Sequence, residues 1–113
     1  MRFDKFTVKA QEAVQAAQSL ADQGNHQSIE PEHLLLALLQ QEEGVVGPIL
    51  AKLGARPEAI RRQVEEELKK LPQVRGGGQY VSPRLESVFN GAWSEAERLK
   101  DEYCSTEHLL IAL

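Results

Sequence analysis

The sequence at 30–38, EPEHLLLAL, returns at 105–113 as STEHLLIAL, 75 positions further along the chain. Nearly every residue that follows the histidine of each copy is apolar. A helix that is apolar on all sides belongs in the interior of a domain, because only there are all its side chains shielded from water. We therefore expect both copies to form buried helices and to pack together as the core pair of the domain.

The offset of 75 also aligns the sequence that precedes each copy, so the chain contains an internal repeat. Residues 7–38 align with residues 82–113 without a gap, and both copies carry apolar side chains at the spacing of an amphipathic helix. These side chains belong to Ala10, Ala13, Val14, Ala17 and Ala21 in the first copy and to Leu85, Val88, Phe89, Ala92 and Ala96 in the second. Thr7 and Ser82 are predicted to cap these two long helices, and Pro83 suits the first helical position.

The sequence between the copies predicts two further helices and a connector. A short helix begins near Gly44 and ends at Gly54, a residue typical of helix C-termini. Another helix follows Pro57, with apolar residues every four positions and charged residues on its other faces. A proline and three consecutive glycines within 72–78 then predict a connector without regular structure. No strand longer than a few residues is expected.

Together these patterns predict an all-α domain of two helical repeats related by a pseudo-twofold axis. Repeat one covers about residues 3–71, the connector about 72–81, and repeat two about 82–113. Repeat two is truncated at Leu113, inside its core helix, whereas repeat one continues for about 33 residues beyond the corresponding position. We therefore expect the chain to be part of a longer protein.

Composition narrows the classes of function. The net charge is −4 and residues of both signs are interleaved, so no basic face is predicted that could neutralise a nucleic-acid backbone. No apolar run approaches the roughly 18 residues that cross a bilayer, and the N-terminus lacks the apolar stretch of a secretory signal. The single cysteine excludes an internal disulfide and suits a reducing compartment. We expect a cytoplasmic domain without nucleic-acid or membrane partners.

Two histidines are candidate metal ligands. His33 and His108 occupy the same position of the two repeats and could face one another across a metal ion. The alternative is that each lies in a first helical turn and bonds locally, next to Glu32 or Glu107, which complements the positive end of the helix dipole. Because no H-E-x-x-H or C-x-x-C pattern supports a metal site, the local role is favoured.

Cys104 and His108 are four residues apart and could form a thiolate–imidazole pair or two ligands of a metal. Cys104 aligns with Ile29, however, which favours a buried cysteine that acts as a small hydrophobic side chain. The glycines at 76–78 lack the lysine and hydroxyl residue of a phosphate-binding loop. The sequence thus predicts no catalytic, cofactor or metal site, with an enzyme built on Cys104, His108 and Glu107 as a remote alternative.

The remaining features favour a surface for polypeptide contact. The two repeats should meet at a cleft with an apolar floor and a charged rim. Phe89 and Trp93 lie on the long helix of repeat two where repeat one has Val14 and Gln18, and Gly91 between them leaves room for a ligand. Phe89 also fits core packing, whereas Trp93 falls at the edge of the apolar stripe. Phe89 and Trp93 are predicted contact residues.

Four stretches of the chain form a recognisable set: FDKFT at 3–7, AQSLA at 17–21, IEPEHLL at 29–35 and LPQV at 71–74. Together they closely resemble the N-terminal repeat domains of the ClpB family of bacterial chaperones, and the resemblance covers the whole chain. Related Clp unfoldases that feed proteases share the double repeat but more often carry Gly-Thr-Glu-His at both core helices. The forms here, Glu-Pro-Glu-His and Ser-Thr-Glu-His, favour the ClpB family.

The resemblance implies that a mobile linker joins this domain to two ATPase modules, which bind ATP and Mg²⁺ and assemble as a hexameric ring. Hsp70-type chaperones deliver aggregated protein to such rings, while the N-terminal domain holds exposed apolar segments. The isolated domain is expected to be a monomer without a cofactor. The substrate-contact positions of the family correspond here to Thr7, Asp101 and Glu107, and its apolar groove positions fall near Phe89, Gly91 and His108.

We therefore expect this chain to bind unfolded or aggregated polypeptides weakly, through an apolar groove with a polar rim. Weak binding suits a domain that must release its client to a ring. The first alternative is an adaptor-docking domain of a protease-linked unfoldase, which would recognise a folded partner through the charged helix at 61–70.

Overall fold

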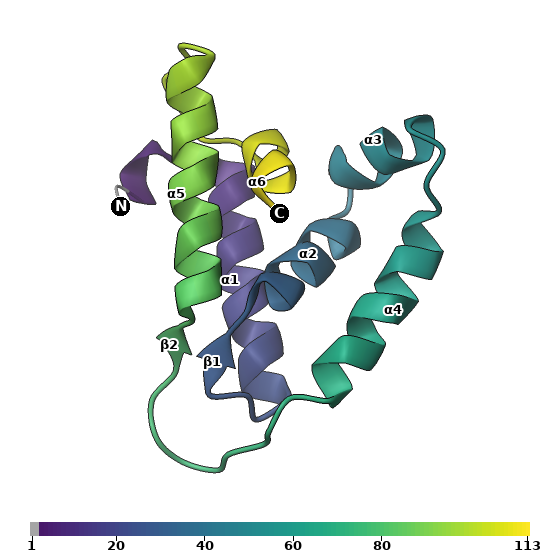
Figure 1. Ribbon diagram of the computed structural model, residues 1–113, viewed down its shortest axis with the longest axis vertical. Helices are drawn as coiled ribbons and strands as arrows, with labels where there is room; N and C mark the ends of the chain where they lie inside the picture. Colours follow the sequence, from purple (N-terminus) through teal and green to yellow (C-terminus); the bar gives the residue numbers. More distant parts are fainter. Residues whose placement is uncertain (1–2) are drawn as a thin grey trace.

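Six α-helices account for most of residues 3–113, which are the residues that the computed structural model describes (Figure 1). The chain runs through a 3₁₀ turn (Phe3–Lys5), α1 (Val8–Gln23), β1 (Ser28–Ile29), α2 (Pro31–Gln40), α3 (Val46–Lys52), α4 (Pro57–Lys69), β2 (Tyr80–Val81), α5 (Pro83–Arg98) and α6 (Thr106–Ala112). The two strands are two residues long and pair in parallel. The predicted all-α fold is confirmed, while the boundaries of the repeats stay a prediction.

The two long helices begin at the predicted caps. The Thr7 side-chain oxygen accepts the backbone N–H of Ala10 (3.2 Å) at the start of α1, and the Ser82 oxygen accepts that of Leu85 (3.0 Å) at the start of α5. Each hydroxyl satisfies a backbone donor that has no partner within its helix. Both helices are 16 residues long, as expected for corresponding elements of two repeats.

The two short helices of the repeated stretch begin with a histidine cap. Nδ1 of His33 accepts the backbone N–H of Glu30, and Nδ1 of His108 accepts that of Ser105, each at 2.9 Å. The third helical residue of a capping box is usually Glu or Gln, so an imidazole acts here in place of a carboxylate or amide. The predicted local role of both histidines is confirmed.

Backbone hydrogen bonds tie the start of each long helix to the opposite repeat. The Thr7 N–H donates to the carbonyl of Cys104 (2.9 Å), and the Cys104 N–H donates to that of Lys5 (2.7 Å). In the other half, the Ser82 N–H donates to the carbonyl of Ile29 (3.1 Å) as part of the β1–β2 pairing. Because these positions are related by the offset of 75, the exchange is reciprocal, as the predicted pseudo-twofold relation requires.

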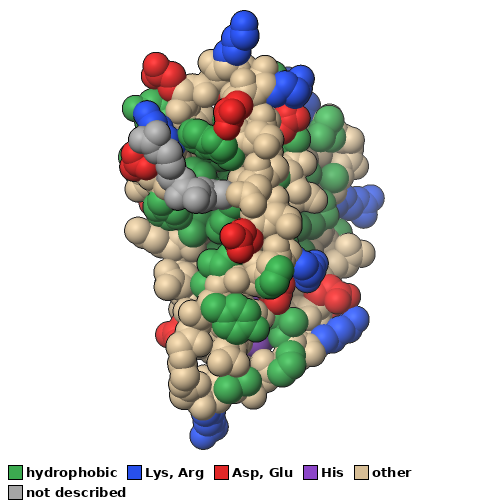
Figure 2. Space-filling model, turned by 60° about the vertical axis from the view of Figure 1, so that its left-hand side comes forward, with side chains coloured by type: hydrophobic (Ala, Val, Ile, Leu, Met, Phe, Trp, Pro, Cys, Tyr) green, Lys and Arg blue, Asp and Glu red, His purple; other side chains and the backbone are tan. Residues whose placement is uncertain are grey.

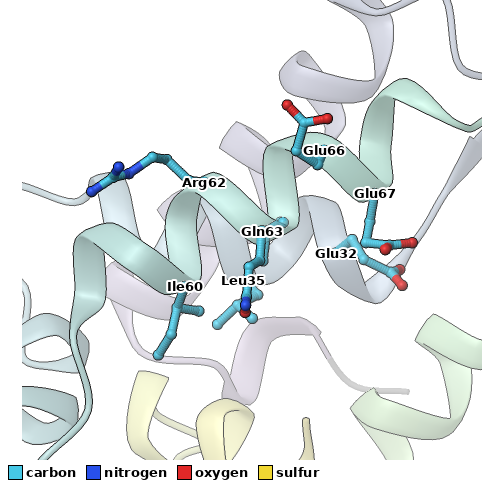
Figure 3. A pocket seen from close by; sticks show the side chains of 8 residues that line it. Glu32, Leu35, Ile60, Arg62, Gln63, Glu66 and Glu67 are labelled. Carbon is cyan, nitrogen blue, oxygen red and sulfur yellow. The ribbon is translucent and has the colours of Figure 1, made fainter.

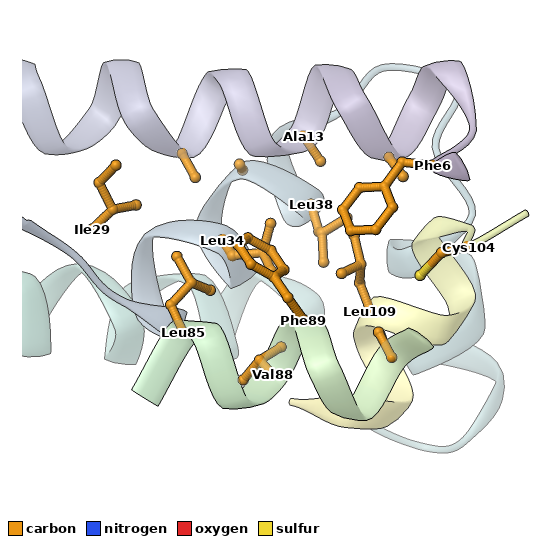
Figure 4. Packing of buried hydrophobic residues seen from close by; sticks show 14 of the residues in the cluster. Phe6, Ala13, Ile29, Leu34, Leu38, Leu85, Val88, Phe89, Cys104 and Leu109 are labelled. Atoms are coloured by element: carbon orange, nitrogen blue, oxygen red, sulfur yellow. The ribbon is translucent and has the colours of Figure 1, made fainter. Parts of the chain in front are cut away.

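The alanine face of α1 forms one side of the core (Figure 4). Ala10, Ala13, Ala17 and Ala21 are each at most 1% exposed. Larger side chains from α2, α5 and α6 pack against this face, among them Leu34, Leu38, Leu85, Phe89 and Leu109. Four buried alanines in register leave little space between α1 and its neighbours, so the core is closely packed along this helix.

The two copies of the repeated stretch both contribute buried leucines to one core, as predicted, but they do not pack mainly on each other. α2 packs mainly on α1 and α4, whereas α6 packs mainly on α5. Leu36 of α2 is buried because Val64 and Leu68 of α4 cover it. Its counterpart on α6, Ile111, is 59% exposed, because no helix within the described residues lies over that side of α6.

The surface carries charges of both signs without a wide basic area on the face drawn in Figure 2. Several of these charges form ion pairs within one helix, such as Lys69 with Glu66 (3.2 Å) and Lys70 with Glu67 (3.0 Å) on α4. Exposed ion pairs of this kind contribute little to stability. Their position in solvent agrees with the charged, solvated face that the sequence predicts for α4. None of the helices between residues 3 and 113 has the length and apolarity needed to span a membrane.

We expect Ser82→Ala to lower the free energy of unfolding by about 1 kcal/mol, because it removes the N-cap of α5 at a buried position. Urea denaturation followed by circular dichroism measures this change. Ser82→Thr retains the capping oxygen and should lose less stability. Equal midpoints for Ser82→Ala and the unmodified chain would contradict the assigned role of this hydroxyl.

Candidate functional site

Two adjoining hollows form an open groove where α1, α3 and α6 approach one another. The first, of about 440 Å³, is lined by Thr7, Val8, Lys9, Gln41, Glu43, Gly44, Val45, Ser105, Thr106 and Glu107. The second, of about 340 Å³, is lined by Gly44, Val45, Pro48, Ile49, Lys52 and Glu107. Because Gly44, Val45 and Glu107 line both hollows, the two adjoin one another. We call them together the Thr7–Glu107 groove.

The exchange between repeats creates this groove. Pairing of Thr7 with Cys104 places the first turn of α1 next to the residues that start α6. Thr7 and Glu107, two contact positions implied by the family resemblance, therefore line the same hollow although they are 100 residues apart. Thr7 also caps α1, so its hydroxyl is partly engaged by the backbone N–H of Ala10.

The Glu107 carboxylate lies exposed at the rim of the groove without a basic partner among residues 3–113. Within the described part of the chain, its one side-chain hydrogen bond comes from the hydroxyl of Thr106 (3.1 Å). Lys9 lines the same hollow, but its ammonium group donates to the carbonyl of Glu42 (3.2 Å) and lies 3.9 Å from Glu12. The groove thus presents a carboxylate that retains free hydrogen-bonding capacity.

The corresponding position in the other half of the domain is closed. Glu32 is the counterpart of Glu107, and Arg84 is the counterpart of Lys9. The Arg84 guanidinium donates to both carboxylate oxygens of Glu32 (3.0 and 3.3 Å) and contacts Glu30 at 3.4 Å. The two repeats therefore share a scaffold, but among residues 3–113 the glutamate at this position is paired in repeat one and unpaired in repeat two.

The floor of the groove is apolar. Val45, Pro48 and Ile49 lie on the groove side of α3, and Val8 begins α1. Val8 is 69% exposed and Val45 is 42% exposed, and Leu53 continues the apolar stripe of α3 at 78% exposure. The sequence predicted α3 but not this exposed stripe. Apolar residues spaced at 45, 49 and 53 are a signal for one, but without the packing partners the buried and exposed faces of so short a helix cannot be told apart.

Asp101, the third contact position implied by the resemblance, lies outside the lining of the groove. It follows α5 in the connector to α6, and its side chain is about half exposed. Its carboxylate oxygen Oδ2 lies 2.9 Å from Nε2 of His108. The structure therefore separates Asp101 from Thr7 and Glu107 and places it next to the histidine that caps α6.

The predicted aromatic contact residues do not line the groove. Phe89 is only 8% exposed and packs edge-on against Phe6, with ring centroids 5.9 Å apart, as its alternative role in core packing predicts, while a role in substrate contact stays a prediction. Trp93 is partly buried against the same core, and its role in binding stays a prediction. Ala112 packs next to Gly91, with its methyl group 3.5 Å from the position of an added Cβ.

The capping histidines each bond to the residue seven positions earlier. Since Nδ1 of His33 accepts a backbone N–H, its Nε2 carries the proton and donates to Nδ1 of His26 (2.9 Å). Burial, followed by the neighbouring His26, lowers the pKa of His33 to about 4, although Glu30 and Glu32 act in the opposite direction. His33 is therefore neutral at physiological pH. Within the described part of the chain, no three His, Cys, Asp or Glu side chains gather as metal ligands would.

Cys104 is fully buried in the core next to the exchange between repeats. Burial raises the pKa of its thiol to about 11, so the thiolate needed for nucleophilic attack is scarce at neutral pH. The interpretation of Cys104 as a small buried hydrophobic side chain is confirmed.

A family model described as the Clp repeat (R) N-terminal domain matches residues 5–113. The chain belongs to this family. It is 47% identical to the chaperone protein ClpB of Bdellovibrio bacteriovorus over 109 residues, which cover 95% of this chain and 13% of that protein. This Clp repeat domain thus corresponds to an N-terminal ClpB domain, which is not a catalytic module, and spans a small part of the relative that it matches.

Solved structures of similar fold are also N-terminal domains. The domain of the E. coli ClpV1 ATPase matches with a TM-score of 0.89 and 27% identity, covering 98% of this chain and 68% of that chain. A ClpV N-domain in complex with a VipB peptide matches with a TM-score of 0.84 and 19% identity, covering 97% of this chain and 68% of that chain. These matches confirm the Clp repeat fold.

We expect the free energy of unfolding to fall as the pH is lowered from about 6.5 to about 4, the pKa values of His33 in the unfolded and folded states. In this interval the unfolded chain binds a proton that the folded chain excludes, which favours unfolding by up to about 1.4 kcal/mol per pH unit. Urea denaturation at a series of pH values measures this slope.

The carboxylates also titrate in this range, so a variant isolates the histidine. His33→Gln retains a side chain that closes a capping box but cannot be protonated. Its stability should decline less steeply below pH 6.5 than that of the unmodified chain. Parallel slopes would show that His33 makes no contribution to the acid sensitivity.

Proposed function

We propose that this domain binds exposed apolar segments of unfolded or aggregated polypeptides in the Thr7–Glu107 groove. The observation that carries the proposal is an unpaired, exposed carboxylate at the rim of an open groove with an apolar floor. An exposed apolar surface rimmed by polar residues is typical of a site that contacts another protein.

An extended segment can use both parts of the groove. Its apolar side chains would contact Val8, Val45 and Ile49, while a backbone N–H would donate to the Glu107 carboxylate. Every polypeptide offers backbone donors, so this combination recognises unfolded chains without a defined sequence. The small apolar floor favours weak binding, because few side chains can be buried there.

The relatives support the same function. The chain matches the N-terminal region of ClpB chaperones, and a ClpV N-domain of the same fold holds a peptide. We infer that the longer protein is a cytoplasmic disaggregase whose ATPase modules bind ATP and Mg²⁺, form a hexameric ring and receive clients from an Hsp70-type system. The domain would present captured segments to that ring.

A second candidate function is docking of a folded adaptor, and one feature of the surface favours it. A hollow of about 580 Å³ lies between α2 and α4 (Figure 3). Leu35, Ile60 and Val64 supply its apolar side chains, while Glu32, Glu66 and Arg62 lie around it. Its lining includes Arg62, Glu66 and Glu67 from the charged helix at 61–70, which is the surface predicted for adaptor docking, and it shares no residue with the Thr7–Glu107 groove.

We expect Glu107→Gln to weaken the binding of an unfolded model protein several-fold, because a carboxylate accepts hydrogen bonds more strongly than an amide. Val45→Asp should weaken binding by about tenfold, since it places a charge on the apolar floor. Val45 is the N-cap residue of α3, so aspartate at this position should preserve the helix. Fluorescence anisotropy of the labelled client, in unfolded and native forms, measures both effects.

Matched variants separate the candidate functions. Glu86→Gln removes a first-turn carboxylate from α5, away from the groove, and should leave binding unchanged. Gln63→Trp fills the hollow between α2 and α4 and should also leave binding of unfolded protein unchanged. Binding of a folded partner that is lost with Gln63→Trp but retained with Val45→Asp would instead support adaptor docking.

A further inference from the structure

The capping histidine of each repeat makes the same two kinds of contact, one through each ring nitrogen. In repeat two, His108 accepts the backbone N–H of Ser105 at Nδ1 and contacts Asp101 Oδ2 through Nε2, both at 2.9 Å. In repeat one, His33 accepts the N–H of Glu30 at Nδ1 and contacts His26 Nδ1 through Nε2, again both at 2.9 Å. Each histidine thus joins the start of its own helix to a residue seven positions earlier.

The residue seven positions before the capping histidine differs in chemistry between the two repeats. What the two residues have in common indicates the property that this position requires. Asp101 and His26 are counterparts under the offset of 75. One is a carboxylate and the other an imidazole, yet both accept a hydrogen bond from Nε2–H of the capping histidine. The common requirement is an acceptor, and a negative charge is not needed.

Asp101 is itself held firmly by the end of α5. Its backbone N–H donates to the carbonyl of Ala96 (2.8 Å), and Lys100 before it adopts a left-handed conformation (φ 60°) that closes the turn. In repeat one, Asn25 precedes His26 with φ 56°, and the His26 N–H donates to the carbonyl of Ala21 (2.8 Å). The acceptor is therefore fixed by the backbone before it meets the histidine.

The helix turn that His108 caps lines the groove, whereas Asp101 does not. His108 is buried and fixes the first turn of α6, and this turn supplies Ser105, Thr106 and Glu107 to the groove. Loss of the acceptor at 101 would free the imidazole and loosen the turn that carries Glu107.

We propose that Asp101 is a positioning residue that acts on polypeptide binding through His108 and not by contact with the client. This inference rests on the proposed function of the Thr7–Glu107 groove. It assigns Asp101 a hydrogen-bonding role in place of the contact role that the family resemblance implies. A neutral acceptor at this position should serve as well as the carboxylate.

The test compares Asp101→Ala with Asp101→Asn in the anisotropy titration with unfolded protein. Asp101→Ala should weaken binding about fivefold, the effect expected for loss of one hydrogen bond. Asp101→Asn retains an acceptor oxygen and should bind within about twofold of the unmodified chain. In a His108→Leu background, Asp101→Ala should have no further effect, because the partner is already absent.

Each other outcome would overturn the proposal. Equal losses for Asp101→Asn and Asp101→Ala would indicate that the charge of Asp101 meets the client directly, as would an undiminished effect of Asp101→Ala in the His108→Leu background. Unchanged affinity of Asp101→Ala would show that the hydrogen bond between Asp101 and His108 does not contribute to polypeptide binding.

A matched control distinguishes positioning from general destabilisation. His26→Ala removes the corresponding hydrogen bond in repeat one, away from the groove, and should lower stability without weakening the affinity. Circular dichroism confirms that each variant is folded before titration. Absence of binding by the unmodified chain would overturn the proposed function of the groove, whereas binding that is insensitive to Asp101→Ala would overturn only the positioning role.

Discussion

The exchange of backbone hydrogen bonds between the two repeats is the constraint on which the rest of the structure depends. Thr7 and Cys104 pair in one half, and Ser82 and Ile29 pair in the other. Each pairing fixes where a long helix of one repeat begins relative to a short helix of the opposite repeat. The Thr7–Glu107 groove is a direct consequence, since one wall belongs to α1 and another to α6.

Two equivalent positions arise from this exchange, and single residues give them different properties. Arginine at 84 closes the position in repeat one by pairing with Glu32, while lysine at 9 bonds elsewhere and leaves Glu107 unpaired. A guanidinium forms two parallel hydrogen bonds with a carboxylate, which an ammonium group cannot do. An internal repeat can thus supply stability on one side and recognition on the other without a change of fold.

The sequence predicted the fold because the repeat doubles every signal: the caps at Thr7 and Ser82 and the apolar stripes of α1 and α5 support one another. It did not predict how α2 and α6 pack, since a uniformly apolar stretch does not reveal which neighbours cover it. The partners of His33 and His108 were also missed. They lie seven residues earlier, across turns in which Asn25 and Lys100 adopt left-handed conformations, and neither residue type requires that geometry.

The use of histidine as a cap links parts of the domain that a glutamate cap would leave separate. The side chain of a capping glutamate bonds the backbone at the helix start, but it has no donor to offer a second partner at neutral pH. A neutral imidazole accepts with one nitrogen and donates with the other, so His108 connects the end of α5 to the start of α6. Since Thr7 comes from repeat one and Glu107 from repeat two, the geometry of the groove depends on this link as well as on the exchange between repeats. The affinity for a ligand in the groove should therefore depend on the structure of both halves of the domain.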